Sequence, residues 1–96
     1  MLERDFQKNL IDELKMIFPG CIVLKNDSSY QQGIPDLSIF YKDKWAMLEV
    51  KKSSDETKKP NQEYFVNLAN EMSFSRFIFP ENKEEVLNEL REKFSA

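Results

Sequence analysis

The stretch GIPDLSIFYKDKWAMLEVKK (residues 33–52) decides the fold of this chain. Two runs rich in strand-forming residues flank the polar pair Lys42-Asp43, which is the pattern of a β-hairpin with a two-residue turn. The open ends of these two strands nevertheless carry three charged side chains, those of Asp36, Glu49 and Lys51. Charges at such positions need a reason, because the rest of both strands is apolar.

The turn sets which of these charges face one another. A turn at residues 42–43 places Asp36 opposite Glu49. Moving the turn to residues 43–44 places Asp36 opposite Lys51 instead. In both registers the three charged side chains share one face of the sheet, and directly opposed Cβ atoms lie ~5 Å apart. A three-residue turn would send them to opposite faces.

The rest of the chain predicts helices on both sides of a sheet. Apolar periodicity and turn residues indicate helices over 3–18, from 60 onward and over 82–94, and strands at 21–25, 36–41, 44–51 and 75–80. Both central strands are apolar on both faces, so helices should cover each side. The helical crossover between the last two strands should make them parallel. The sequence therefore predicts one α/β domain over residues 1–96, a three-layer α/β/α sandwich on a small mixed sheet.

Composition excludes several kinds of chemistry. The chain has no histidine, which excludes Ser–His and Cys–His nucleophiles, and only two glycines, too few for a phosphate-binding loop. Its single cysteine, Cys21, excludes a disulfide framework and a structural zinc site. No apolar run approaches the ~20 residues of a membrane span, and the charged N-terminus is unlike a signal peptide. We therefore expect a cytoplasmic protein without membrane contact.

The charged residues at the strand ends predict a metal site. Glu3 falls in the centre of the apolar stripe of the first helix, so it should point at the interior or at a cleft. With Asp36 and Glu49 it makes three acids against one lysine, a deficit that a divalent cation would balance. Oxygen ligands without sulfur or imidazole favour Mg²⁺ or Mn²⁺. Such an ion polarises a phosphodiester and lowers the pKa of a bound water, so the residues indicate metal-dependent phosphodiester hydrolysis.

The motif Pro35-Asp36 followed by Glu49-Val50-Lys51, in an α-β-β-β-α-β order, resembles the PD-(D/E)XK nuclease superfamily. In particular it is similar to the VRR-NUC (virus-type replication-repair nuclease) branch, over positions 3 to about 79. The resemblance implies a restriction-endonuclease-like core with an added C-terminal helix. It also implies a metal site and a catalytic set, in which Asp36 and Glu49 bind the metal with help from the Val50 carbonyl, Lys51 assists the water, and Glu3 and Gln62 complete the site.

The resemblance also suggests partners. It implies a DNA endonuclease acting on branched DNA such as four-way junctions, working as a homodimer, and small stand-alone members resemble phage-encoded proteins of the host cytoplasm. Segment 51–59 carries four lysines against two acids. The residues expected to contact DNA phosphates are Lys25, Lys52, Lys58 and Lys59.

Each expectation has an alternative. The acids around Lys51 could form an ordinary salt-bridge set, and Glu3 could simply stabilise the start of its helix. A lysine-rich segment is often only a solvated face. The chain could accordingly be a nuclease-like fold that binds nucleic acid or a protein partner without cutting.

Overall fold

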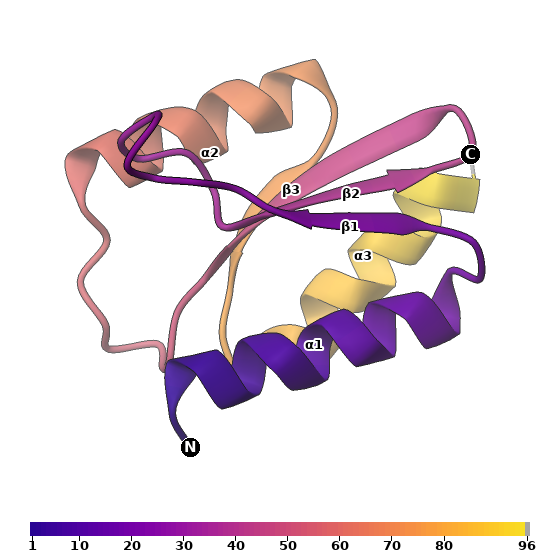
Figure 1. The fold of residues 1–96 in the computed structure, drawn as a ribbon, viewed down its shortest axis with the longest axis horizontal. Coiled ribbons are helices and arrows are strands. Elements are labelled where there is room, and N and C mark those ends of the chain that lie inside the picture. Colours follow the sequence, from indigo (N-terminus) through magenta and orange to yellow (C-terminus); the bar gives the residue numbers. More distant parts are fainter. Residues whose placement is uncertain (96) are drawn as a thin grey trace.

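A four-stranded mixed sheet with strand order β1-β2-β3-β4 lies between helices in the computed structural model, which describes residues 1–95 (Figure 1). The elements in chain order are α1 (Glu3–Ile17), β1 (Ile22–Lys25), β2 (Leu37–Tyr41), β3 (Lys44–Val50), α2 (Pro60–Met72), β4 (Ser75–Ile78) and α3 (Lys83–Ser95). The order and types predicted from the sequence are confirmed, although the strands begin or end a few residues from the expected positions. Within residues 1–95, no helix combines the length and apolarity needed to cross a membrane.

The hairpin of β2 and β3 has the first of the two predicted registers. Tyr41 pairs with Lys44 and Leu37 pairs with Leu48, so the turn is the two-residue one at positions 42–43. Lys42 takes the left-handed conformation that such a turn requires, with φ 58°. Asp36, directly before β2, therefore lies beside Glu49, and the alternative pairing of Asp36 with Lys51 is wrong.

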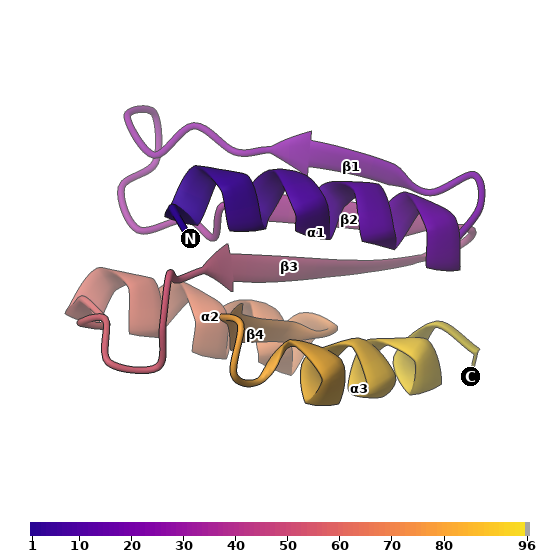
Figure 2. The same cartoon turned by 90° about the horizontal axis from the view of Figure 1, so that it is seen from below.

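Helices cover both faces of the sheet, as expected. α2 lies on one face, and α1 and α3 lie on the other (Figures 1 and 2). β3 and β4 are parallel, as the crossover through α2 predicts. The core between the sheet, α1 and α3 is aliphatic with an aromatic end, where the rings of Phe18, Tyr41 and Phe94 contact one another.

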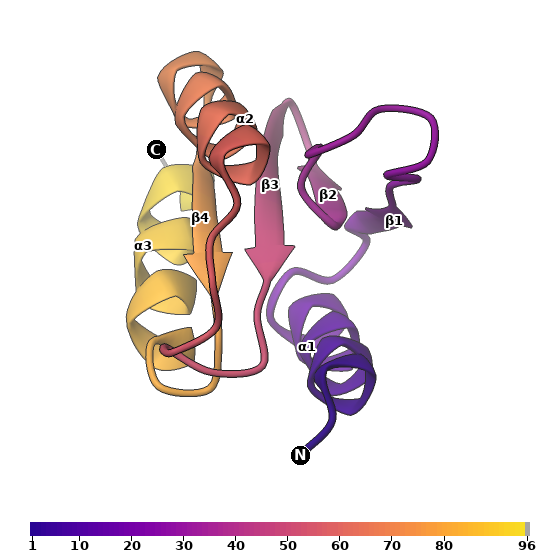
Figure 3. The same ribbon diagram turned by 90° about the vertical axis from the view of Figure 1, so that its left-hand side faces the viewer.

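The cover on the α2 face is incomplete. α2 packs over β3 and β4, while β1 and β2 have no helix above them on this side (Figure 3). The apolar side chains left exposed there are Ile22, Leu24 and Phe40. The expectation that helices would cover both faces therefore holds fully only on the α1–α3 side.

The loop before β2 is held against α2 and against β1. Gly33 has φ +90°, and a Cβ added there would lie 2.8 Å from the Asn61 backbone oxygen at the start of α2. Asn26 donates from its side chain to the Pro35 carbonyl at 2.9 Å, and its N–H donates to the Asp36 carbonyl at 2.8 Å. These contacts fix the backbone that carries Asp36.

Candidate functional site

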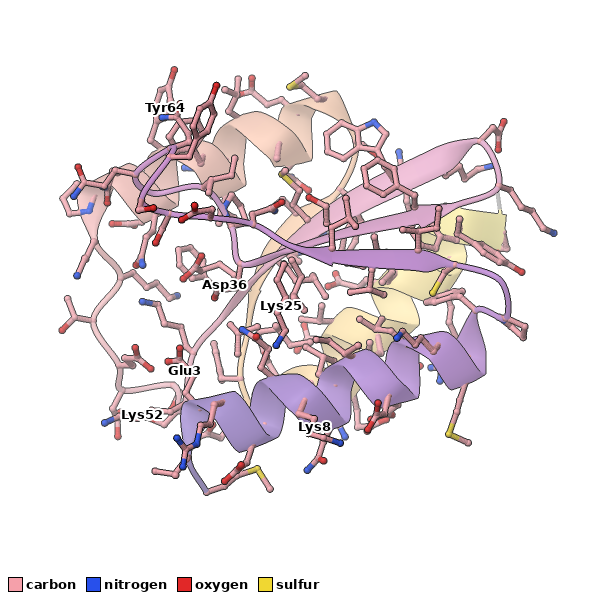
Figure 4. The ribbon with its side chains drawn as sticks, in the orientation of Figure 1. Glu3, Lys8, Lys25, Asp36, Lys52 and Tyr64 are labelled. Atoms are coloured by element: carbon pink, nitrogen blue, oxygen red, sulfur yellow. The ribbon has the colours of Figure 1, made fainter. Side chains whose placement is uncertain are left out.

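The charged residues singled out from the sequence gather at one end of the sheet. β1 and β3 end there, β2 begins there, and the first turns of α1 and α2 reach the same end (Figure 3). Glu3 comes from α1 and Asp36 from the start of β2, and both point into the space between the two helices (Figure 4). Five segments that are distant in sequence thus contribute to one site.

Asp36 and Glu49 form a carboxyl pair. Asp36 Oδ2 accepts a hydrogen bond from the Val50 N–H at 2.9 Å, and the register of β2 and β3 places its carboxyl group beside that of Glu49. Glu49 is only 4% exposed. Burial, and next the charge of Asp36, raise the pKa of Glu49 to about 8, and burial also raises the pKa of Asp36. Both acids are therefore harder to ionise than exposed carboxyl groups.

Gln62 links the lysine to this pair. Lys51 is 3% exposed, and its Nζ donates to Gln62 Oε1 at 2.8 Å. The amide of Gln62 donates in turn to Glu49 Oε2 at 3.2 Å. The Lys59 N–H also donates to Gln62 Oε1, at 3.1 Å, which ties the amide to the start of α2. Gln62 is thereby fixed in the orientation that serves both Lys51 and Glu49.

The ammonium of Lys51 is not ion-paired with either acid of this pair. No ion pair within 4 Å joins its ammonium to Asp36 or Glu49, both of which the structure describes. Its ion pair is with Glu56, at 3.7 Å. The positive charge still lowers the pKa values of both acids, from a longer distance and against the effect of burial.

Glu56 is the residue that sequence reasoning missed. It lies in the connector between β3 and α2, where its Oε1 accepts from the Lys52 N–H at 2.6 Å. Burial, and then the charge of Glu56, raise the pKa of Glu3. The only sequence signal for Glu56 was an acid within a lysine-rich connector.

The donors of this end of the sheet suit a hard cation only in part. Within residues 1–95, no three acidic, cysteine or histidine side chains are gathered closely enough to hold a metal ion among them. The Asp36–Glu49 pair remains, together with the Val50 carbonyl, which points to the same strand edge as the Val50 N–H that meets Asp36. Two carboxylates and a carbonyl are oxygen ligands of the kind that Mg²⁺ accepts while keeping several waters. The residues present therefore fit such an ion, with Glu3 further from the pair.

The four lysines expected to meet DNA surround this end of the sheet. Lys25 ends β1, and the other three, Lys52, Lys58 and Lys59, belong to the connector that also carries Glu56. All four are exposed, and Lys58 Nζ lies 4.9 Å from the centre of the Phe77 ring.

Comparisons of the chain with protein-family models, with curated proteins and with solved structures found no match.

The raised pKa of Glu49 predicts a pH-dependent stability. The folded-state pKa of Glu49, about 8, lies above its ordinary value of 4.5, so the folded protein binds more protons than the unfolded chain between these limits. We expect the free energy of unfolding of the metal-free protein to fall as pH rises from about 4.5 to about 8. Denaturant titrations at several pH values would measure this, and Glu49→Gln should flatten the profile. An equally steep profile in that variant would contradict the assignment.

Proposed function

We propose that this protein is a Mg²⁺- or Mn²⁺-dependent DNA endonuclease whose fold is a restriction-endonuclease-like core of the VRR-NUC kind. The observation that carries the proposal is the half-buried Asp36 beside the buried Glu49, with Lys51 linked to Glu49 through Gln62. A purely structural salt bridge does not require two adjacent acids while the neighbouring ammonium pairs with a third, Glu56.

Each residue has a definite task in this proposal. Asp36 and Glu49 hold the cation with the Val50 carbonyl, and the bound ion would supply an activated water and stabilise charge on the phosphate. Gln62 holds Lys51 at a fixed distance from Glu49, so that the ammonium can orient the attacking water or meet the developing charge. Glu56 forms the ion pair of the lysine at 3.7 Å, and Glu3 lies at the same end of the sheet.

Features around the site are compatible with a DNA backbone as substrate. Exposed lysines surround the carboxylates, and the first turn of α2 lies at the same end of the sheet (Figure 3). Helix N-termini attract phosphate. A 96-residue domain has little room for a separate reader of base sequence, so recognition should use the backbone and shape of the DNA, with branched molecules as the first candidates.

Metal binding should be measurable without any DNA. We expect Mg²⁺ or Mn²⁺ to raise the melting temperature, because an ion that binds only the folded state stabilises it by about 2.7 kcal/mol at a hundred times its Kd. Glu49→Gln should abolish the rise. Glu92→Gln, the same change at an exposed position on α3, should keep it. A rise of equal size in wild type and Glu49→Gln would place the ion elsewhere and remove the support for the site.

A second candidate function is DNA binding at the same site without cleavage. A nuclease-like protein that binds DNA without cutting would retain the exposed lysines. The Asp36–Glu49 pair would then have no catalytic role. Incubating linear and branched DNA with and without Mg²⁺ separates the two, because binding without cleavage at any metal concentration supports only the second.

We also propose that the protein forms a two-fold dimer through β1. The two edges of the sheet differ: the outward groups of β4 are bonded by side chains, since Ser75 N–H donates to Asn70 Oδ1 and the Phe77 carbonyl accepts from Asn82 Nδ2. Among residues 1–95, no side chain bonds the backbone of β1, and the exposed Leu24 adjoins this open edge. An unprotected edge with apolar neighbours favours pairing with a second copy.

The dimer predicts an effect of one charge at this edge. Leu24→Glu should convert a dimer into a monomer, because two copies of the new charge would face each other across the two-fold axis. Light scattering at tens of micromolar would measure the mass. Tyr64→Glu, on the exposed side of α2, is the control and should stay dimeric. A monomeric wild type, with and without four-way junction DNA, would remove the proposal.

A further inference from the structure

A cavity of about 480 Å³ lies between β4 and α2, beside the carboxylate site but separate from it. Its β4 side is formed by Ser75, Phe77 and Phe79, and its α2 side includes Asn67 and Asn70. This volume falls within the ~300–1,000 Å³ that small-ligand sites usually have. None of these residues has a task in the proposed cleavage chemistry.

The β4 side of the cavity presents two aromatic rings. Ser75, Phe77 and Phe79 occupy alternate positions of an extended segment, so their side chains share one face. Both phenylalanines are half-buried, and Lys58 Nζ lies 4.9 Å from the centre of the Phe77 ring. Aromatic faces next to a cation are the groups on which proteins stack unpaired nucleobases while neutralising the adjoining phosphate.

The cavity also contains a polar group without a partner. Ser75 is 1% exposed, and its hydroxyl is the only buried side-chain nitrogen or oxygen within residues 1–95 that has no hydrogen-bond partner. Native proteins rarely leave such a group unpaired. Asn67, exposed at the rim, makes no side-chain hydrogen bond among the described residues, whereas Asn70 Oδ1 already accepts from the Ser75 N–H. The Ser75 hydroxyl is enclosed, so the exposed Asn67 amide is the group that offers both a donor and an acceptor to the edge of a base.

Charge around the cavity favours an anionic ligand. Lys58 and Arg76 line it, against one acid in the lining, Glu63. Arg76 is partly engaged, because its Nε lies 3.4 Å from Glu89 Oε1. Lys58 has no ion pair within residues 1–95, so it is the cation available to a phosphate.

The cavity lies one strand away from the carboxylates. Phe77 is the register partner of Glu49 across β3 and β4, and neighbouring strands are ~4.8 Å apart. Lys58 belongs to the same connector as Glu56. A nucleotide held here would therefore flank a phosphate placed at Asp36 and Glu49.

We propose that this cavity binds one unpaired nucleobase of a DNA strand, stacked on Phe79 and hydrogen-bonded by Asn67, with Lys58 on its phosphate. A base stacked within a duplex is not available to such a cavity, so the site selects strands with an unpaired nucleotide next to the scissile phosphate. The choice of DNA as the ligand rests on the proposed function. The inference that the ligand carries a base and a phosphate rests on the cavity alone.

The test uses the full chain in EDTA, so that binding is measured without cleavage. The probe is a fluorescent single-stranded oligothymidylate, compared with the same oligonucleotide carrying abasic sites, by anisotropy. We expect Phe79→Leu, which keeps an apolar side chain but removes the flat ring, to weaken binding of the intact probe between about fivefold and a hundredfold. Asn67→Asp, at an exposed position, should also weaken it, while Asn9→Asp on α1 should have no effect. Melting curves verify that each variant is folded.

The outcomes separate this inference from the proposed nuclease. Equal affinity of wild type for the intact and abasic probes, or unchanged affinity in both Phe79→Leu and Asn67→Asp, would overturn the base site and leave the cavity to water. Weaker binding by these variants, in a protein that cuts no DNA with Mg²⁺, would support the base site and refute the nuclease. Cleavage of DNA that depends on neither Phe79 nor Asn67 would support the nuclease and refute the base site.

Discussion

Replacing Asp36 with Asn is expected to lower metal-dependent DNA cleavage by at least about a hundredfold, the scale of losing one key electrostatic group of an active site. The change removes one metal ligand charge while preserving the size of the side chain. The Asn oxygen can still accept from the Val50 N–H, the bond that Asp36 makes at 2.9 Å. Cleavage should therefore fall without a change in the backbone. Asp12→Asn, at an exposed position on α1, is the matched control and should retain activity.

The same variant distinguishes a catalytic pair from a structural one. Asp36 and Glu49 repel each other when both are ionised, so Asp36→Asn should leave metal-free stability level or raise it. If Asp36 instead anchored the fold as an ion-pair partner, the change should lower the free energy of unfolding by about 1–3 kcal/mol. Chemical denaturation beside a cleavage assay measures both quantities. Lower stability with normal cleavage per folded molecule would contradict the site.

Replacing Gly33 with Ala is expected to have the largest effect on stability. A non-glycine residue in the left-handed region costs ~1–2 kcal/mol. The new Cβ would in addition meet the Asn61 backbone at 2.8 Å, which forces the start of α2 to move at a further cost of about 1–3 kcal/mol. Because Gln62 follows Asn61, the movement should also break the link between Lys51 and Glu49 and lower cleavage.

The chain contains its own control for this prediction. Gly20 has φ +88°, close to the +90° of Gly33, but an added Cβ there meets no atom within 4 Å. Gly20→Ala should therefore lower the free energy of unfolding only by the cost of the left-handed backbone. Its cleavage activity should be unchanged. Denaturant unfolding of both variants gives the comparison. Equal losses of stability would show that the contact with Asn61 carries no weight.

The hairpin could be predicted because its information is local. Alternation in two strands and the two polar residues 42–43 favoured two registers of a two-residue turn, and both placed Asp36, Glu49 and Lys51 on one face, whereas a three-residue turn would have separated them. Choosing between the registers required the backbone itself, in which Lys42 takes the left-handed conformation. The position of Gln62 at the start of α2 also followed from a local signal, the proline at position 60.

The other features of the site and of the sheet depend on tertiary contacts. No periodic pattern in the sequence reveals such contacts. Glu56 lies in an irregular connector, and only the closing of that connector over β3 brings it to Lys51. For the same reason the sequence did not reveal that the ammonium of Lys51 contacts the Gln62 side chain and Glu56. The exposure of Leu24 reflects how far α2 extends across the sheet, a property of packing rather than of the strand's own pattern.

The proposed function, cleavage of DNA at the Asp36–Glu49 end of the sheet with a bound metal ion, can be tested on a panel of single-stranded, duplex, flap and four-way substrates, each with Mg²⁺, with Mn²⁺ and with EDTA. We expect cleavage of at least the branched substrates with a divalent ion and none with EDTA. Intact substrates throughout, for a folded protein with either ion, would contradict it.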